Sequence, residues 1–563
     1  MDPLPRILRT RWPRGFLVLF CVILWLPGFF SLPPGDRDES RFAQATKQML
    51  ESGDVIRIQN GPEARNLKPV GIYWAQLPFV AAAERLGLGE ANPIWRYRLP
   101  SLLGALLAVL ATYRFGIALV GEGAARLAAA LLAAALLLVV EHDIAKTDAA
   151  LLGVTTVAMG LLSRAWLDPA GFGRWQAALF WLALAAGVLL KGPVTPMVAG
   201  LSIMVLALAA LWRREREGLA CLASLRPKLG VPIFLAVTLP WFSAIAIATH
   251  GAFFVDSLGH DLGGKITGVS NGHGAPPGTH LLLLPLTLFP ASLALFAALP
   301  AFWAARKTRR GQFLLAWIVP SWLVFEAAPT KLPHYPLPLF PAILMIVATS
   351  LLARERPAPL WLARLSAGAF ALALAVLGVG AALLPFVVAP GLGRANLYGV
   401  PGCLAAAVIA WAVMPAAWAG DTRVATGRAL LLAPLLYWAV LEAELPHLDA
   451  LWIAPRVAAM LAGRTPAGEG FGAIGYQEPS LRFVVGTKTR FLTGPGDAAR
   501  FLADGGRVVL VDAAERDAFL AAANALGVPT TPIATLDGFD LGRGRRVTLF
   551  LYAASAGELT HLQ

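Results

Sequence analysis

Residues 124–163 read AARLAAALLAAALLLVVEHDIAKTDAALLGVTTVAMGLLS. Two apolar runs, near 124–140 and 144–163, are joined by a polar corner at 141–148. Because a helix needs about 20 largely apolar residues to cross a bilayer, the stretch predicts two transmembrane helices whose connection lies at a membrane surface. It therefore decides the fold class, that of a mainly α-helical, polytopic membrane protein.

Similar apolar runs continue along the 563-residue chain, which is 57% hydrophobic and 14% charged, with a mean hydropathy of +0.65. This balance is typical of a chain dissolved in lipid. The formal charge of +13 would suggest nucleic acid, but the basic residues form short clusters between apolar runs, as orientation signals do. We therefore expect no nucleic-acid partner. About thirteen transmembrane helices are predicted, near 15–32, 98–120, 124–140, 144–163, 175–190, 194–212, 229–249, 281–304, 311–328, 336–353, 362–388, 398–419 and 425–443.

The basic clusters also predict how the chain is oriented. Arginines within residues 6–14 place the N-terminus in the cytoplasm by the positive-inside rule. Threading the segments alternately then puts the clusters at 213–216, 306–310 and 354–356 on the same side. We expect a bacterial inner-membrane protein with its chemistry in the periplasm. The periplasmic parts would be the loops 33–97 and 250–280, the corners 141–148 and 329–335, Lys191, and everything after about 444.

The extramembrane regions comprise a patterned first loop and a C-terminal domain. In the loop, Arg41–Ser52 and Val70–Leu86 predict helices lying at the membrane interface. After about 466 the composition changes to short β-rich runs, so we predict a transmembrane domain over 1–444 and a small soluble α/β domain over 466–563. The expected strands are Phe471–Tyr476, Leu481–Val485, Arg507–Asp512 and Val547–Tyr552, with helices near 496–504 and 514–526 and a turn at 542–544.

Charged and aromatic side chains concentrate in the predicted periplasmic loops and corners. Charges at membrane depth are expensive and are usually kept for a function. For single residues a structural interpretation stays open: Asp148 as a helix N-cap carboxylate and Lys191 as a snorkelling lysine. Their convergence on one face favours a functional site. The candidates are Asp38, Glu39, Arg41, Lys68, Tyr73, Asp148, Lys191, His260, Lys265, Lys331, His334 and Tyr335.

These side chains suit displacement at a carbon that bears a phosphate leaving group. Carboxylates deprotonate an attacking hydroxyl, while lysine, arginine and tyrosine donors stabilise charge developing on the phosphate. A site beside the bilayer lets the lipid tail of such a phosphate remain in the membrane.

The motifs around these residues resemble a known family, the bacterial aminoarabinose transferases that modify lipid A. These belong to the wider protein-mannosyltransferase-like group of GT-C glycosyltransferases. Asp38–Ala43 is similar to the family motif Asp-Glu-x-Arg-Tyr-Ala. Leu67-Lys68-Pro69, with Tyr73-Trp74 after it, resembles the motif Glu-Lys-Pro-Pro and its trailing Tyr-Trp. The other elements that recur in the family's order are Asp148, Lys191-Gly192-Pro193, His260 to Lys265, Pro276-Pro277-Gly278 and Lys331-Leu332-Pro333-His334-Tyr335.

The resemblance implies inverting transfer of a sugar from a polyprenyl-phosphate carrier to a lipid or glycan acceptor on the periplasmic side. It implies Asp38 as the catalytic base or acceptor-orienting carboxylate, with Asp148 as its partner. Lys191 would support the carboxylates or the donor. Arg41, Lys68, Lys265 and Tyr335 would hold the carrier phosphate, and Glu39, Tyr73, His260, Lys331 and His334 are further expected substrate-binding residues.

One departure from the family pattern concerns metal binding. In family members that bind a divalent metal, a glutamate directly precedes the lysine and a histidine follows in the later loop. Here Leu67 takes the position of the glutamate, although His260 is retained. A two-ligand site that lacks one ligand is doubtful unless Glu63 substitutes. We expect no catalytic requirement for a metal or other cofactor; a divalent metal at His260 stays an alternative.

Other functions stay open at this stage. A protein O-mannosyltransferase-like enzyme would use the same site with another acceptor, so lipid A, protein, lipopolysaccharide core and other envelope glycans all remain candidates. A lipid or sugar transporter would need polar residues along a path through the bilayer, whereas the predicted spans carry few charges between their ends. A sensor built on the C-terminal domain would leave the charged loops unexplained.

Overall fold

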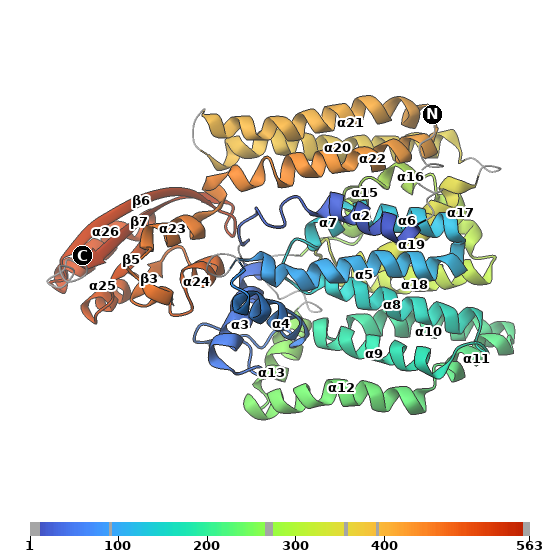
Figure 1. Ribbon diagram of the computed structural model, residues 1–563, viewed down its shortest axis with the longest axis horizontal. Helices are drawn as coiled ribbons and strands as arrows, with labels where there is room; N and C mark the ends of the chain where they lie inside the picture. Colours follow the sequence, from blue (N-terminus) through green and yellow to red (C-terminus); the bar gives the residue numbers. More distant parts are fainter. Residues whose placement is uncertain are drawn as a thin grey trace.

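The computed structural model describes residues 12–35, 37–88, 93–264, 274–353, 358–389 and 393–554, with the side chains of residues 216–218, 258 and 260–262 outside this description. Long helices lie side by side in a bundle that forms most of the molecule. A sheet with its own short helices stands at one end of this bundle (Figure 1). The architecture confirms the predicted fold class of a helical membrane protein with a C-terminal α/β domain.

Every predicted span overlaps one or more of the helices, which differ widely in length. Within the described residues, seven segments are long and apolar enough to cross a membrane by themselves: Trp95–Val120, Asp148–Leu167, Val194–Arg213, Pro227–Ala248, Leu360–Val388, Arg394–Trp418 and Thr422–His447. The helices in the region before residue 462 are α2 (Pro13–Trp25), α3 (Asp38–Ser52), α4 (Gly71–Arg85), α5 (Trp95–Val120), α6 (Glu122–Ala134), α7 (Leu136–Glu141), α8 (Asp148–Leu167), α9 (Arg174–Lys191), α10 (Val194–Arg213), α11 (Arg216–Ser224), α12 (Pro227–Ala248), α13 (Ala252–Phe254), α15 (Thr279–Thr287), α16 (Ser292–Leu295), α17 (Leu299–Ala305), α18 (Arg309–Ala327), α19 (Phe340–Leu352), α20 (Leu360–Val388), α21 (Val400–Trp418), α22 (Thr422–Leu441) and α23 (Ile453–Leu461).

Two of the predicted spans are interrupted. The run 124–140 divides into α6 and α7 because Ala135 takes an extended backbone conformation between them. The run 281–304 divides into α15, α16 and α17, and Pro285 and Pro290 lie within it. Proline lacks the N–H that continues a helix, so the second interruption has a cause in the sequence.

The start of α8, which carries Asp148, is held by a close crossing with α5. A Cβ on Gly104 of α5 would lie 2.3 Å from Ala150 Cα, and a Cβ on Gly153 would lie 2.5 Å from the Gly104 carbonyl oxygen. Glycines at such a crossing let two backbones approach closely, as small residues do between membrane helices. The crossing therefore fixes where the first turn of α8 presents its side chains.

Alanine at Gly153 is expected to lower the free energy of unfolding by about 1–3 kcal/mol, the usual effect of an added methyl group in a well-packed interior. Alanine at Gly200 of α10, where an added Cβ meets nothing within 4 Å, is expected to raise it by up to about 1 kcal/mol through helix propensity. Thermal unfolding in detergent measures both variants. If both variants change the free energy of unfolding in the same direction, the close crossing of α5 and α8 is contradicted.

The C-terminal domain is a mixed five-stranded sheet in the order β4-β3-β5-β7-β6. β3 is parallel to β4 and β5, whereas β7 is antiparallel to β5 and β6. Its buried face packs against α23. The elements are β3 (Phe471–Ile474), α24 (Pro479–Val485), β4 (Arg490–Phe491), α25 (Pro495–Ala503), β5 (Val508–Asp512), α26 (Arg516–Ala525), β6 (Thr530–Asp540) and β7 (Arg545–Ala554).

Two details of this domain differ from the sequence prediction. The prediction of a strand at Leu481–Val485 is wrong, because Pro479 at the first helical position begins α24 there. The strand β6 was not expected, since Pro532 and Gly538 interrupt its pattern. Both residues are tolerated because β6 lies at the edge of the sheet.

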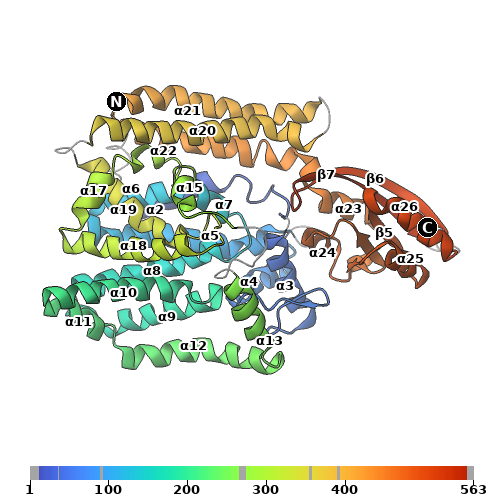
Figure 2. The same ribbon diagram turned by 180° about the vertical axis from the view of Figure 1, so that it is seen from behind.

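The sheet domain rests on the first extramembrane loop, where α24 lies beside α3 (Figure 1, Figure 2). Gln44 Nε2 donates to Thr487 Oγ1 at 2.8 Å, and the buried Arg482 donates from NH1 to the Asn60 carbonyl at 2.6 Å. Arg37 donates to the Gly542 carbonyl. The α/β domain thus helps to hold the segment that carries Asp38.

Candidate active site

The corner between α7 and α8 gathers charges of both signs in a buried position. Lys146 Nζ lies 2.9 Å from Glu141 Oε1 and 3.7 Å from Asp148 Oδ2. The side chains of Glu141, Lys146 and Asp148 are 4%, 12% and 7% exposed. A buried charge without a partner costs several kcal/mol, so these residues are stable together and not singly.

Two further elements bring an ammonium group and an imidazole ring to Asp148. Lys191, the last residue of α9, donates from Nζ to Asp148 Oδ1. His334, in the turn before α19, places Nε2 3.7 Å from Asp148 Oδ1 and Nδ1 3.7 Å from Glu141 Oε1. We call Glu141, Lys146, Asp148, Lys191 and His334 the corner cluster.

The position of Lys191 follows from the chain around it. The helix α9 ends there because Gly192 adopts a φ of +64°, a left-handed conformation that glycine takes without steric penalty. The Lys191 ammonium lies 5.7 Å from the centroid of the Tyr335 ring, close enough for a cation–π contact. Two opposing elements therefore orient this ammonium.

Burial and ion pairing change the protonation equilibria of the corner cluster. Burial raises the pKa of Glu141 above its ordinary value, against the attraction of Lys146. Burial alone would lower the pKa of Lys146, but Glu141 and Asp148 hold it above its ordinary value. Lys146 is therefore a permanent cation at neutral pH, and Glu141 retains a proton more readily than an exposed glutamate.

A cavity of about 430 Å³ opens beside the corner cluster. Its charged and polar lining includes Lys68, Asp148, Lys191 and His334, and Asp148 contacts both Lys191 and His334. A cavity with a few charged groups in an otherwise apolar lining suits a ligand with a charged head and an apolar tail. Most of the remaining wall is apolar, with Leu67, Pro69, Leu151, Val194, Met197, Phe242, Phe253, Phe254, Val324, Phe325, Leu337 and Pro338.

Asp38, at the start of α3, belongs to a second group of charges. Its Oδ1 lies 3.7 Å from Arg41 NH1 and 4.0 Å from Arg65 NH2, and its side chain is 64% exposed. Arg65 is buried over the Phe42 ring, at 4.8 Å from the ring centroid. We call Asp38, Arg41 and Arg65 the loop cluster. The charge of Asp38 also contributes to the raised pKa of Lys146, so the loop cluster adjoins the corner cluster.

The loop cluster has the electrostatics of an anion site. Burial, and then the positive charge of Arg65, lower the pKa of Arg41, and Asp38 only partly offsets them. Two guanidinium groups held near each other repel, and an anionic ligand between them relieves the repulsion. Arginine also matches the oxygen geometry of phosphate.

A third group, the anchor cluster, consists of Glu39, Arg98 and Asp143 and lies in the interior. Arg98 binds Glu39 through two bonds, Nε to Oε1 at 2.9 Å and NH2 to Oε2 at 3.2 Å. Arg98 NH1 lies 3.5 Å from Asp143 Oδ1. Glu39 also accepts from the backbone N–H of Gly35 at 2.7 Å and of Ala145 at 3.0 Å. These contacts tie the first loop, α5 and the α7–α8 corner together.

The structure brings some of the predicted site residues together and places others elsewhere. Lys68, Asp148, Lys191, His334 and Tyr335 line the cavity, and Asp38 and Arg41 form the loop cluster.

Glu39, Tyr73 and Lys331 do not line the cavity. Glu39 is enclosed in the anchor cluster, and Tyr73 is fully buried with its hydroxyl 3.4 Å from Arg65 Nε. Lys331 is buried and donates to the Ala328 carbonyl at 2.5 Å. Lys265 and the side chain of His260 lie outside the described residues.

Sequence reasoning did not single out Glu141, Lys146, Arg65, Arg98 or Asp143. Three of them, Glu141, Asp143 and Lys146, lie in the corner EHDIAKTD. The four charges of this corner, placed between two apolar runs, could have identified them. Arg98 lies within a predicted span and Arg65 in a loop without a motif. Only their contacts distinguish them from snorkelling or solvated arginines.

The residues around the cavity offer a poor donor set for a divalent metal. Among the described residues there is no group of three His, Cys, Asp or Glu side chains that could hold one. Leu67 lines the cavity without a donor atom, and Glu63 is exposed on the two-residue strand β2 (Glu63–Ala64). The expectation that transfer needs no metal stays a prediction.

An extramembrane site of carboxylates and cations at one end of a helical bundle, open to an apolar cavity, is the arrangement of a GT-C glycosyltransferase. The family described as dolichyl-phosphate-mannose-protein mannosyltransferase (PMT) matches residues 36–253. The chain is similar to this family over these residues, and it is a multi-pass membrane glycosyltransferase that uses a polyprenyl-phosphate-linked sugar.

Proteins similar to this chain include transferases of aminoarabinose. An undecaprenyl phosphate-alpha-4-amino-4-deoxy-L-arabinose arabinosyl transferase of Pectobacterium carotovorum is 29% identical over 403 residues, which cover 68% of each chain. A protein of the same description from Pseudomonas aeruginosa is 28% identical over 347 residues, 59% of this chain and 56% of the relative.

Solved structures show the same fold over nearly the whole chain. The crystal structure of ArnT from Cupriavidus metallidurans bound to undecaprenyl phosphate superposes with a TM-score of 0.71 at 19% identity, covering 96% of this chain and 98% of the other. Its apo state gives a TM-score of 0.68 at 21% identity, covering 95% and 98%. The likeness confirms the predicted GT-C architecture.

Proposed function

We propose that the protein moves an aminoarabinose-like sugar, or another pentose or hexose, from a polyprenyl-phosphate carrier to lipid A or another envelope lipid or glycan. The observation that carries the proposal is the cavity, whose mostly apolar lining also contains Lys68, Lys191 and Asp148. A carrier lipid presents the same division, a hydrocarbon chain that ends in a phosphate. The aminoarabinose transferases among the relatives add support for the substrate class.

The proposed reaction is a displacement with inversion. An acceptor oxygen attacks the anomeric carbon, the bond from this carbon to the carrier phosphate oxygen breaks, and the phosphate leaves with the bonding electrons. The proton of the acceptor passes to Asp38, an exposed carboxylate at the start of α3. Lys68, Arg41 and Lys191 stabilise the charge on the leaving phosphate.

Asp148 and Glu39 have different proposed roles. Asp148 contacts Lys191 and His334 within the cavity wall, so it orients the Lys191 ammonium and the His334 ring toward the phosphate. Both oxygens of Glu39 are engaged by Arg98 and by backbone N–H groups. We therefore assign Glu39 to positioning the loop that carries Asp38, in place of direct substrate contact.

The orientation and domain division are part of the same proposal. The site and the domain 466–563 face the periplasm of a bacterial inner membrane, and residues 1–444 form the catalytic membrane domain. The basic clusters at the other ends of the helices support this orientation. Labelling of a C-terminal tag on intact spheroplasts tests it, and a tag labelled only after lysis contradicts it.

Asn at Asp38 and Ala at Lys68 are each expected to lower transfer from a labelled polyprenyl-phosphate donor by about 100-fold or more, as loss of a base or of a phosphate donor does. The matched control is Glu51→Gln, which changes an exposed carboxylate near the end of the same helix as Asp38. Circular dichroism and gel filtration establish that the variants fold. If both variants transfer at the wild-type rate, this loop is not the site.

Protein as acceptor is a second candidate, favoured by the match of residues 36–253 to the PMT family. Mass spectrometry of envelope lipids and of envelope proteins from a deletion strain separates the two candidates. A sugar missing from lipid A supports the first candidate, and a sugar missing from a protein supports the second.

A further inference from the structure

A second cavity, of about 640 Å³, lies at the opposite end of α8 from Asp148. The helix ends at Leu167, and Asp168, Pro169 and Phe172 of the following turn line the cavity. A helix of 20 residues rises about 30 Å, so this second cavity lies at the other membrane surface. We call it the interfacial cavity.

Exposed tryptophans mark the level of this cavity in the membrane. Trp175 at the start of α9, Trp212 at the end of α10 and Trp303 of α17 are 75%, 89% and 68% exposed. Each is on an element that begins or ends next to a segment lining the interfacial cavity. Because exposed tryptophans gather where hydrocarbon meets headgroups, the interfacial cavity lies at headgroup depth.

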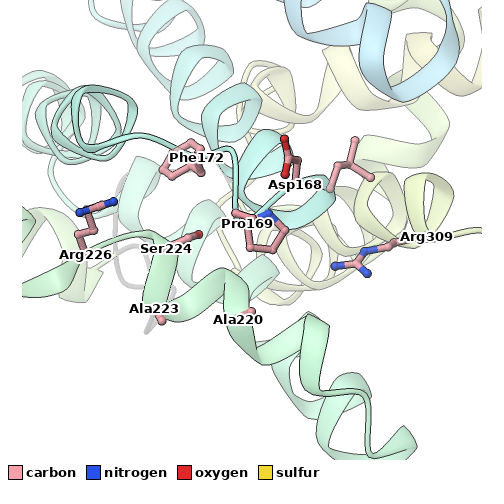
Figure 3. A pocket seen from close by; sticks show the side chains of 10 residues that line it. Asp168, Pro169, Phe172, Ala220, Ala223, Ser224, Arg226 and Arg309 are labelled. Atoms are coloured by element: carbon pink, nitrogen blue, oxygen red, sulfur yellow. The ribbon is translucent and has the colours of Figure 1, made fainter.

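Charges of both signs line the interfacial cavity. Arg226, Asp168 and Arg309 come from three separate segments and surround Pro169 and Ser224 (Figure 3). Arg309 is held in place, since it donates from NH2 to the Trp166 carbonyl at 2.7 Å and lies 4.8 Å from the centroid of the Trp166 ring.

Asp168 is fixed as well, because its Oδ1 accepts from the Gly171 backbone N–H at 2.9 Å. A purely anionic ligand would meet the repulsion of this carboxylate. A ligand that carries both a phosphate and an ammonium group pairs with both Arg309 and Asp168, with the arginine binding the phosphate and the carboxylate accepting from the ammonium.

We propose that the interfacial cavity binds the headgroup of an aminophospholipid from the surrounding membrane. Arg309 binds the phosphodiester, Asp168 binds the primary ammonium, and the acyl chains extend along the exposed apolar helices. Sites of this kind between membrane helices recognise headgroups by such charges. The proposal is independent of the sugar-transfer function, because no residue of the interfacial cavity belongs to the corner, loop or anchor clusters.

Native mass spectrometry of the full-length protein tests the proposal after exchange into vesicles of phosphatidylethanolamine, phosphatidylcholine or phosphatidylglycerol. Wild type is expected to retain phosphatidylethanolamine about three- to tenfold better than phosphatidylcholine, the ratio for one hydrogen bond to a charged group at a partly exposed site. Phosphatidylcholine has no ammonium proton to donate. Equal retention of these two lipids, or preferential retention of phosphatidylglycerol, would overturn the proposal.

Substitutions test whether the lipid preference arises in the interfacial cavity. Asp168→Asn keeps an oxygen for the Gly171 N–H and is expected to abolish the preference for phosphatidylethanolamine, while Arg309→Gln is expected to weaken retention of both phospholipids. Arg310→Gln is the matched control, since Arg310 is exposed on the same helix as Arg309 but does not line the interfacial cavity. An equal effect of Arg310→Gln would assign the retention to general surface charge.

A competition experiment distinguishes a membrane lipid from a soluble molecule with the same headgroup. Free glycerophosphoethanolamine is expected not to displace the lipid at concentrations where vesicle phosphatidylethanolamine does, because it lacks acyl chains. Displacement at equal concentration would overturn the assignment to a membrane lipid.

Discussion

Replacement of Asp148 by asparagine is expected to lower the rate of sugar transfer by about 100-fold or more, the usual effect of removing one element of electrostatic preorganisation. Asp148 lies in the cavity wall, accepts from Lys191, and is 3.7 Å from both Lys146 and His334. Asparagine keeps the shape but loses the charge that draws these cations together. Lys191 then moves away from the position that we propose for the phosphate.

The double variant Asp148→Asn, Lys191→Met separates this role from folding. Removing both partners leaves less uncompensated charge in the interior than removing one, so thermal stability should recover toward that of wild type. Transfer should stay low, because the double variant has neither the ammonium nor the carboxylate. Single-turnover assays in nanodiscs and thermal unfolding give the two measurements. Transfer that recovers together with stability would show that Asp148 is structural and not part of the site.

The contrast between Asp148 and Glu39 shows which features of the site the sequence could predict. Both are acidic residues next to a predicted span, and both were candidates for the site. The periodicity of the apolar runs determines that they lie at one membrane surface. It does not determine which carboxylate faces the cavity and which is enclosed by Arg98, because this depends on side-chain packing between segments far apart in the chain.

The helix boundaries likewise include some that the sequence predicts and some that it does not. Runs of apolar residues predicted where helices form, since every predicted span overlaps a helix and lipid requires an internally bonded backbone in each span. The interruption of 124–140 at Ala135 has no breaker residue in the sequence. Here the almost entirely buried helix α6 packs within the bundle, so protein contacts replace the lipid and a short helix suffices.

In the C-terminal domain, local secondary-structure propensity predicted one element wrongly. Leu481–Val485 is apolar and β-branched enough to suggest a strand, yet it forms the helix α24 that contacts α3. The buried Arg482 explains the difference, since only a helix places it against Asn60 while Phe483 packs at 5.3 Å against the Tyr97 ring. Tertiary contacts with the membrane domain thus decide the conformation.

Leucine at Arg98 is expected to lower the free energy of unfolding by about 3–5 kcal/mol, the effect of removing one partner from a buried ion pair. Arg98 is 2% exposed and lies between Glu39 and Asp143. It also donates to the carbonyl groups of Phe29 and Leu32 at 3.2 and 3.0 Å. Without it, two carboxylates and several carbonyl groups lose their partner in a site that water does not reach.

The rate of sugar transfer by Arg98→Leu should fall as well. The anchor cluster joins the loop that contains Asp38 to the corner that contains Asp148. Arg98→Lys is expected to rescue little, since an ammonium cannot bind both Glu39 oxygens as the guanidinium does. Arg85→Leu, at an exposed position in the last turn of α4, is the matched control. Thermal unfolding and limited proteolysis of the first loop measure the effect. Wild-type stability of Arg98→Leu would show that the anchor cluster does not hold the site together.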